Sequence, residues 1–76
     1  MNEFISYLIQ NLVDKPEAVQ VLSLENPQGT VVEVRVASED IAKVVGRHGK
    51  TIKSLRTIVV SIGARFGKRV HLELVQ

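Results

Sequence analysis

The sequence contains no cysteine, only two histidines and only three aromatic residues. Without cysteine there is neither a disulfide framework nor a thiolate metal site, which suits a reducing cytoplasm, where we expect the protein to reside. The two histidines, His48 and His71, are too few for a histidine-based metal cage, and we expect no cofactor. The aromatics, Phe4, Tyr7 and Phe66, are too sparse for a base-stacking platform of the RRM or OB type.

No stretch reaches the roughly 18 consecutive apolar residues that a membrane-spanning helix requires. The partly apolar run from Phe4 to Val13 follows Glu3 instead of a cationic segment and has no small-residue cleavage signature, so we interpret it as part of the fold. With 76 residues, the chain is expected to form a single domain over positions 1–76.

Acidic residues are missing from positions 43 to 69, although the whole chain has eight of them and a formal net charge of only +2. Eight of the ten basic residues fall in that interval: Lys43, Arg47, Lys50, Lys53, Arg56, Arg65, Lys68 and Arg69. A one-sided basic field of this kind favours a polyanionic partner. The alternative is a solvated helix face that binds nothing, and charge alone does not decide between them.

The first half of the chain predicts a helix followed by a hairpin. After a candidate cap at Asn2, apolar residues recur at three- and four-residue spacing, which predicts an amphipathic helix that ends before Pro16: Phe4, Ile5, Leu8, Ile9 and Leu12. Positions 19–24 are largely apolar or β-branched, 26–29 carry turn residues, and 30–37 alternate with Val32, Val34 and Val36 on one face. We expect these two strands to pair as a hairpin.

The second half predicts two helices and a third strand. Ser38 is a candidate N-cap for a short helix that runs through Val45 and stops at Gly46. Residues 50–66 have the longest helical period, with an apolar arc of Ile52, Leu55, Val59, Ile62 and Phe66. Gly63 predicts close packing or fraying, and Gly67 predicts the helix end. Residues 68–75 alternate as a strand, so the predicted order is α-β-β-α-α-β.

Residues 46–49 read Gly-Arg-His-Gly and connect the two predicted helices. Because glycine lacks a Cβ, this loop can adopt positive φ and let a sugar-phosphate backbone approach closely. The N–H groups at the start of the following helix have no intrahelical partner and favour anions, and Arg47, Lys50 and Lys53 add charge. The pattern predicts a phosphate cradle; the alternative is a glycine-rich turn that only joins two helices.

A four-residue GxxG pattern is common by itself, but here it continues as apolar-apolar-Gly-x-x-Gly-x-x-Ile-x-x-Leu from Val44 to Leu55. In this context the chain resembles the KH domain, and its element order resembles the type II variant, over essentially its whole length. The segment Arg56-Thr57-Ile58-Val59 makes it similar to the small bacterial single-domain proteins of the KhpA family.

That resemblance implies an α+β fold in which a three-stranded mixed sheet has helices packed on one face. It also implies single-stranded RNA as the ligand and a role as an RNA chaperone or post-transcriptional regulator. As protein partners it implies a second copy, in a homodimer, or KhpB, a larger KH-containing protein, in a heterodimer.

The expected RNA site combines the loop with an apolar floor. The residues expected to grip the backbone of about four nucleotides are Gly46, Arg47, His48, Gly49, Lys50 and Lys53. Ile41, Val44 and Val45 would lie under the bases, together with the neighbouring edge of the second strand. Core packing is the alternative role for Val44 and for Ile52, because buried aliphatic residues chiefly form cores.

His48 is expected to contact phosphate or base without catalysis, since the sequence places no partner carboxylate or nucleophile beside it. The alternative is an exposed, mostly neutral side chain. Contacts made mainly to the backbone predict modest affinity and weak sequence preference.

Two other functions fit parts of the sequence. Gly49-Lys50-Thr51 matches the end of a nucleotide-binding P-loop, but Val44 stands where that motif requires its first glycine, so we do not expect an enzyme. The second is a protein–protein interaction module without direct RNA recognition. Ile58 and Val60 lie outside the core arc of the long helix, which predicts a dimer interface there. Alternatively, they only border the core.

Overall fold

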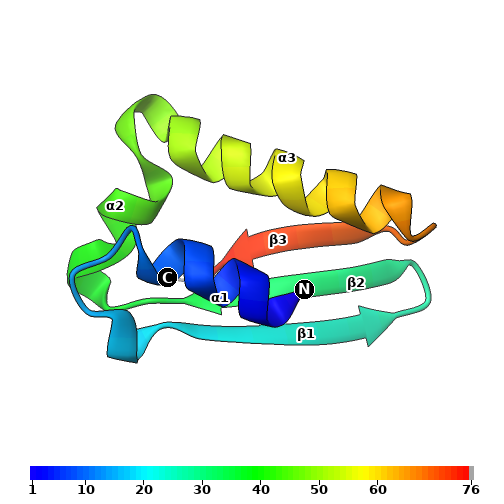
Figure 1. Cartoon of the computed structure of the whole chain (residues 1–76), viewed down its shortest axis with the longest axis horizontal. Helices are drawn as coiled ribbons and strands as arrows, with labels where there is room; N and C mark the ends of the chain where they lie inside the picture. The colour runs from blue at the N-terminus through cyan, green and yellow to red at the C-terminus, as the bar shows by residue number, and fades with distance from the viewer. Residues whose placement is uncertain (76) are drawn as a thin grey trace.

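The computed structural model describes residues 1–75, and its elements follow the predicted order α-β-β-α-α-β, with short 3₁₀ turns between them (Figure 1). The elements are α1 (Asn2–Gln10), η1 (Pro16–Ala18), β1 (Gln20–Asn26), β2 (Gly29–Arg35), η2 (Ser38–Asp40), α2 (Ile41–Val45), η3 (Arg47–Gly49), α3 (Lys50–Arg65) and β3 (Val70–Leu74). Residues 46–49 therefore connect α2 to α3, as the sequence predicts. No helix within residues 1–75 has both the length and the apolar character needed to cross a bilayer.

The three strands form one mixed sheet in the order β1-β2-β3. β1 and β2 are antiparallel, with Ser23 opposite Val32, and the predicted hairpin is confirmed. β2 and β3 are parallel, with Val32 opposite Leu72, because the chain returns to the sheet through α2 and α3. The central strand β2 is therefore paired on both sides, so the prediction that its edge borders the RNA floor is wrong. The sheet edge beside α3 belongs to β3.

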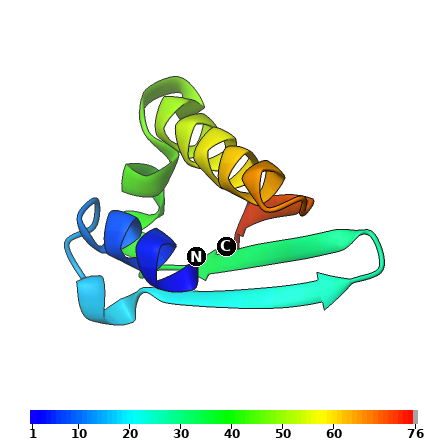
Figure 2. The ribbon, with the colours of Figure 1, turned by 45° about the vertical axis from the view of Figure 1, so that its right-hand side comes forward.

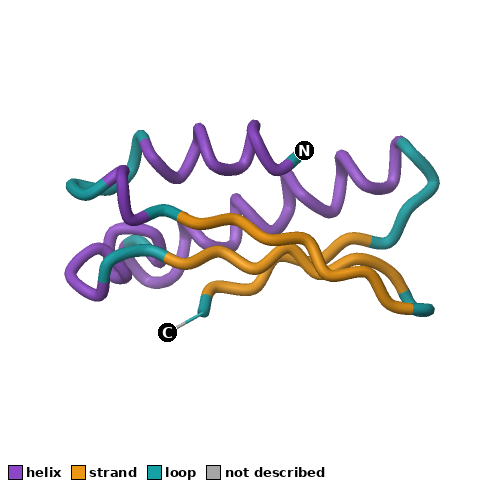
Figure 3. Tube along the Cα trace, turned by 90° about the horizontal axis from the view of Figure 1, so that it is seen from below, coloured by secondary structure: helices purple, strands orange, loops and turns teal. Residues whose placement is uncertain are grey.

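α1 and most of α3 lie on one side of this sheet, and α2 lies past the ends of the strands (Figure 1 and Figure 3). Alternate residues of the strands point toward α1 and α3, so Val32 and Val34 are fully or almost fully buried, whereas His71 and Glu73 on the other face are exposed. The buried core draws on all three helices and on β2 and β3: Ile5, Ile9, Val32, Val34, Val44, Ile52, Leu55, Val59, Val70 and Leu72. The α+β class with one covered sheet face is confirmed.

Three apolar residues predicted on buried helix faces lie in solvent. Phe66 follows the last residue of α3 and is 73% exposed, Phe4 is 47% exposed and Leu12 is 38% exposed. Leu12 lies beyond α1, which ends at Gln10. Phe66 and Leu12 therefore lie past the ends of their helices, whereas Phe4 lies at the margin of an apolar arc that meets the sheet on one side only.

The two predicted side-chain caps are not made. Ser38 donates its hydroxyl to Glu39 Oε1 at 2.8 Å and caps no helix. Asn2 lies inside α1, where its Oδ1 accepts the hydroxyl of Ser23 in β1 at 2.7 Å. Asn2 therefore connects α1 to the sheet instead of starting the helix.

The C-terminal end of α3 agrees with prediction. Gly67 has φ 68°, its N–H donates to Ala64 O at 3.0 Å, and the N–H of Lys68 donates to Gly63 O at 2.8 Å. These two bonds are the Schellman pattern that glycine favours. A Cβ on Gly63 would lie 2.6 Å from Val70 Cγ2, which confirms the close packing predicted there and seats α3 on β3.

Candidate nucleic-acid interface

The loop between α2 and α3 has positive φ at three of its four positions. Gly46 has φ 78° and ψ 174°, a region that is essentially restricted to glycine. Gly49 lies in the left-handed helical region at φ 73°, and His48 joins it at φ 56°, which is uncommon for a residue with a Cβ. The glycine pattern predicted the two glycine conformations, whereas the strained His48 backbone has no signal in the sequence.

The two loop glycines meet different surroundings. A Cβ on Gly46 would lie 2.2 Å from Thr51 Oγ1 and 2.6 Å from Thr51 Cβ, so the first turn of α3 packs directly against this part of the loop. A Cβ on Gly49 would meet no such neighbour within 4 Å. A ligand backbone can therefore approach the loop at Gly49, while Gly46 holds the loop against α3.

Exposed cations surround this opening. Arg47, Lys50 and Lys53 are exposed, and the ion pairs among residues 1–75 involve only Lys15 and Lys43. α3 begins at Lys50, so the N–H groups of its first turn and the positive end of its dipole lie at the same place. Side-chain charge and backbone donors thus coincide at one end of α3.

A buried carboxylate braces the segment that supports the loop. Asp40, directly before α2, is 1% exposed, and its oxygens accept the N–H groups of Asp14 at 3.2 Å and Lys15 at 3.0 Å. Lys43 Nζ lies 3.4 Å from Asp40 Oδ1. Burial opposes ionisation, but these donors outweigh it and lower the pKa of Asp40. The chain that follows α1 is thereby tied to α2.

Two exposed ion pairs lie around this junction, between Lys15 and Glu39 and between Lys43 and Asp14. The hydrogen bond from Lys15 is the main cause that lowers the pKa of Glu39 from 4.5 to about 2. Because Lys43 is engaged by two carboxylates, it adds little to the charge that faces a ligand. Lys43 is therefore part of the basic run in the sequence, but in the folded protein its charge is paired.

The structure separates the predicted floor residues. Val44 is 0% exposed and lies in the core, so its predicted contact with bases is wrong and its alternative role in core packing holds. Ile52, at 7% exposed, also packs in the core. Ile41 and Val45 are half-buried on α2 and retain surface beside the loop. The reason is that a five-residue helix buries one side completely against its neighbours.

Five residues of the basic run lie near the two ends of α3, while Arg56 and Arg65 lie within the helix. Arg47, Lys50 and Lys53 lie at the start of α3, whereas Lys68 and Arg69 follow its other end, beside the hairpin turn (Figure 1). The 16 residues of α3 separate them by about 24 Å. The predicted length of this helix was the only sequence signal for this separation. For the brace at Asp40 there was none, because its partners lie 25 and 26 residues away.

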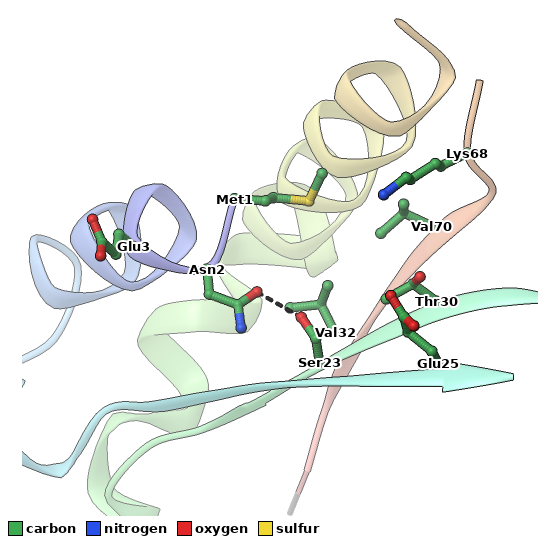
Figure 4. Close-up of a pocket in the computed structure, with 9 residues that line it drawn as sticks. All are labelled: Met1, Asn2, Glu3, Ser23, Glu25, Thr30, Val32, Lys68 and Val70. Carbon is green, nitrogen blue, oxygen red and sulfur yellow. Dashed lines mark hydrogen bonds between the residues drawn. The ribbon is translucent and has the colours of Figure 1, made fainter. Parts of the chain in front are cut away.

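A cleft of about 420 Å³ lies away from the loop, between the start of α1, the hairpin and the start of β3 (Figure 4). Lys68 extends toward it above Val70, and Glu25 lines its hairpin side. The hydroxyl group of Ser23, one of the residues that line the cleft, donates to the Asn2 amide oxygen at 2.7 Å. No cluster of three His, Asp or Glu side chains within residues 1–75 could hold a metal ion.

A GxxG loop between two helices that pack on one face of an α-β-β-α-α-β mixed sheet defines the type II KH domain. The family model described as "KhpA/KhpB, KH domain" matches residues 2–74. The chain belongs to this KhpA/KhpB family of KH domains.

Curated relatives match along nearly their whole length. The chain is 42% identical over 76 residues to the RNA-binding protein KhpA of Chlamydia pneumoniae, a match that covers 100% of this chain and 97% of that protein. It is 46% identical over 72 residues to the RNA-binding protein KhpA of Streptomyces coelicolor, covering 95% and 90% of the two chains.

Among solved structures, the chain is similar to Aquifex aeolicus Era, with a TM-score of 0.61 and 21% identity. That match covers 96% of this chain and 28% of the Era chain. At this level of identity the likeness supports the fold alone.

Proposed function

We propose that the protein binds single-stranded RNA and that residues 46–49 clamp the RNA backbone. The observation that carries the proposal is the meeting, at one end of α3, of the open Gly49, the unpaired Arg47, Lys50 and Lys53, and the N–H groups of the first helical turn. The relatives named as RNA-binding proteins support RNA as the polyanion.

In this proposal each group has a distinct task. Arg47 donates two hydrogen bonds to phosphate oxygens, whereas Lys50 and Lys53 act as point charges near the helix start. His48 contacts phosphate or base from its strained position, and Ile41 with Val45 supports the bases. The brace at Asp40 holds α2 in place before RNA arrives, which reduces the ordering cost of binding.

The chemistry of the site favours binding without catalysis. Phosphate contacts position a strand but carry little base information, so we expect tolerant sequence preference. Such a protein suits a role as an RNA chaperone or post-transcriptional regulator in the cytoplasm, where it would act without inserting into a membrane.

The test replaces the two central loop residues with acids, as Arg47→Asp with His48→Asp. A single-stranded RNA of about four nucleotides matches the reach of one such loop. We expect its affinity, measured by NMR titration, to fall on the order of 30-fold, because two favourable contacts become repulsive. Both side chains are exposed, so the two substitutions remove no contact from the core.

A matched control is available on the sheet. Arg35→Asp changes another exposed arginine, at the end of β2, and it should weaken binding far less than Arg47→Asp alone. If the folded loop variant bound the short RNA as tightly as the wild type, or if Arg35→Asp were equally harmful, the clamp would be refuted.

We also propose that an exposed side of α3 pairs with a second KH domain. Ile58 is 37% and Val60 47% exposed, and they lie on the two flanks of the α3 side that faces the core, so Ile58 marks one exposed flank. The partner is a second copy in a homodimer, or the KH domain of a larger KhpB-like protein in a heterodimer; the family description covers both names. Two loops in one dimer would add avidity to a weak single site.

Ile58→Asp should convert the dimer to a monomer in light scattering, because a charge cannot be buried unpaired at an interface. Leu24→Asp is the matched control, since Leu24 is a similarly exposed aliphatic residue, 44%, on the open face of the sheet. A folded Ile58→Asp variant with unchanged mass would exclude this surface as the interface.

A further inference from the structure

The end of the molecule opposite residues 46–49 carries its own unpaired cations. Lys68 and Arg69 join α3 to β3, and both are exposed, as is His71 two residues later. The ion pairs among residues 1–75 involve none of these side chains. The clamp proposed at the loop does not use them, although they account for part of the basic run.

Two recesses border Arg69 where the hairpin turn meets the start of β3. The larger, about 390 Å³, is lined by Arg69 and His71 and by the side chains of Asn26 and Gln28. The smaller, about 200 Å³, lies between Arg69 and Lys68 and includes one carboxylate, that of Glu25. Asn26 Oδ1 accepts the N–H of Gln28 at 2.9 Å, which leaves the amide N–H groups of Asn26 as donors. Both recesses are therefore rich in hydrogen-bond donors.

The backbone beneath these donors is held firmly. The N–H of Thr30 donates to Arg69 O at 2.8 Å, and a Cβ on Gly29 would lie 2.4 Å from the same oxygen. Hairpin and β3 are thus in direct contact at this point. Arg69 is anchored through its main chain while its guanidinium stays unpaired, which leaves its fork geometry available to a phosphate.

We propose that this hairpin end is a second phosphodiester-binding site, formed by Lys68, Arg69 and His71 with the amides of Asn26 and Gln28. It would hold RNA that extends beyond the GxxG loop, so the proposal rests on the proposed RNA-binding function. It deepens that function by making one KH domain contact one RNA at two places.

The distance between the two sites fixes the RNA length that can reach both. About 24 Å of helix separates them, which equals about seven nucleotides at the 3.4 Å rise of a stacked strand. The loop itself covers about four nucleotides. An RNA of about four nucleotides therefore occupies the loop alone, whereas one of about twelve reaches the hairpin end as well.

The test measures both RNA lengths against Lys68→Gln with Arg69→Gln, which removes two charges and leaves the main-chain contact of Arg69 intact. We expect unchanged affinity for the short RNA and a loss on the order of tenfold for the long one. The slope of log affinity against log salt should fall by about 1.4 for the long RNA, at about 0.7 for each lost phosphate contact.

Arg69→Gln and Arg35→Gln form a matched pair, because each removes one exposed arginine. If both substitutions lowered the affinity for the long RNA equally, the effect would be one of net charge, and the proposed site would be refuted. Unchanged affinity of the double variant for the long RNA would refute it as well. NMR adds a direct readout: the amides of Thr30 and Arg69 should shift with the long RNA only. Failure of the loop clamp gives a different result: the variant with Arg47→Asp and His48→Asp would bind the short RNA as tightly as the wild type.

Discussion

The two ends of α3 are built alike in one respect and differ in another. At each end a glycine lies in close contact beneath exposed cations: Gly46 against Thr51 at the loop, and Gly29 against Arg69 at the hairpin. At the loop the chain runs into the start of α3, where N–H groups of the first helical turn have no intrahelical acceptor, although the N–H of Lys50 donates to Arg47 O. At the hairpin the N–H of Thr30 is already paired with Arg69 O.

This difference determines which hydrogen-bond donors each end of α3 presents to an anion. The loop end supplies backbone donors and a helix dipole in addition to side chains, so its grip is local and directional. The hairpin end supplies side chains only, so its contribution should be weaker and more sensitive to salt. Figure 2, turned from the first view, shows the hairpin extending clear of α1, where long RNA would have access.

The largest effect on stability is expected from a substitution that adds a side chain where Gly46 contacts Thr51. Gly46→Ala should lower the free energy of unfolding by about 3 kcal/mol, because the residue would be strained at this φ and ψ and would overlap Thr51. Gly49→Ala should cost only about 1 kcal/mol, since it meets left-handed strain but open space. Urea unfolding of both variants gives the two values, and equal costs would contradict the asymmetry of the loop.

A smaller loss is expected when the brace behind the loop is removed. Asp40→Ala leaves the partly buried N–H groups of Asp14 and Lys15 without their acceptor, and Tm should fall on the order of 10 °C. Glu39→Ala is the control, because it breaks only an exposed ion pair and should change Tm by less than about 3 °C.

The brace also predicts which residues change their environment in the Asp40→Ala variant. In NMR spectra of Asp40→Ala, amide shifts should move around α2 and residues 46–49 and stay in place at Thr30 and Arg69. Shifts spread evenly over both ends would mean that the two ends are not structurally independent.

The smallest effect is expected from acid. Folding lowers the pKa of Glu39 to about 2 and also lowers that of Asp40, so the folded state binds fewer protons than the unfolded state. The stability that these groups contribute is complete above their unfolded pKa values, near 4, and is lost as pH falls through the folded values. Tm should therefore decline by a few degrees below about pH 4 and continue to decline toward pH 2.

Asp40→Asn tests this assignment, because it cannot ionise. Its Tm should start lower and depend less on pH in the same interval, as followed by circular dichroism. A wild type and variant with parallel pH profiles would assign the acid sensitivity to Glu39 instead of Asp40.

Much of the fold was predictable because its signals are local. The alternation of Val32 and Val34 and the helical spacing of Leu55 and Val59 depend on neighbours within a few positions, and all four residues are buried as expected. The same local logic placed the GxxG loop between two helices. It failed for Phe66, because α3 ends at Arg65 and a residue past the helix end no longer follows the helical period.

The candidate site was predictable in part. The exposure of Arg47, Lys50 and Lys53 follows from their place at a helix start, and the open Gly49 follows from the pattern. Val44 was misassigned because spacing cannot tell a residue beneath a ligand from one beneath a helix.

Local sequence determined the order of elements, the location of the loop and the sign of its charge. Apolar periods of two and 3.6 residues predict strands and helices, and the glycines predict the loop between two of the helices. The parallel pairing of β2 with β3 and the burial of Asp40 against residues 14 and 15 came from long-range packing. These features depend on contacts between segments far apart in the chain, and such contacts exist only once the helices have docked on the sheet.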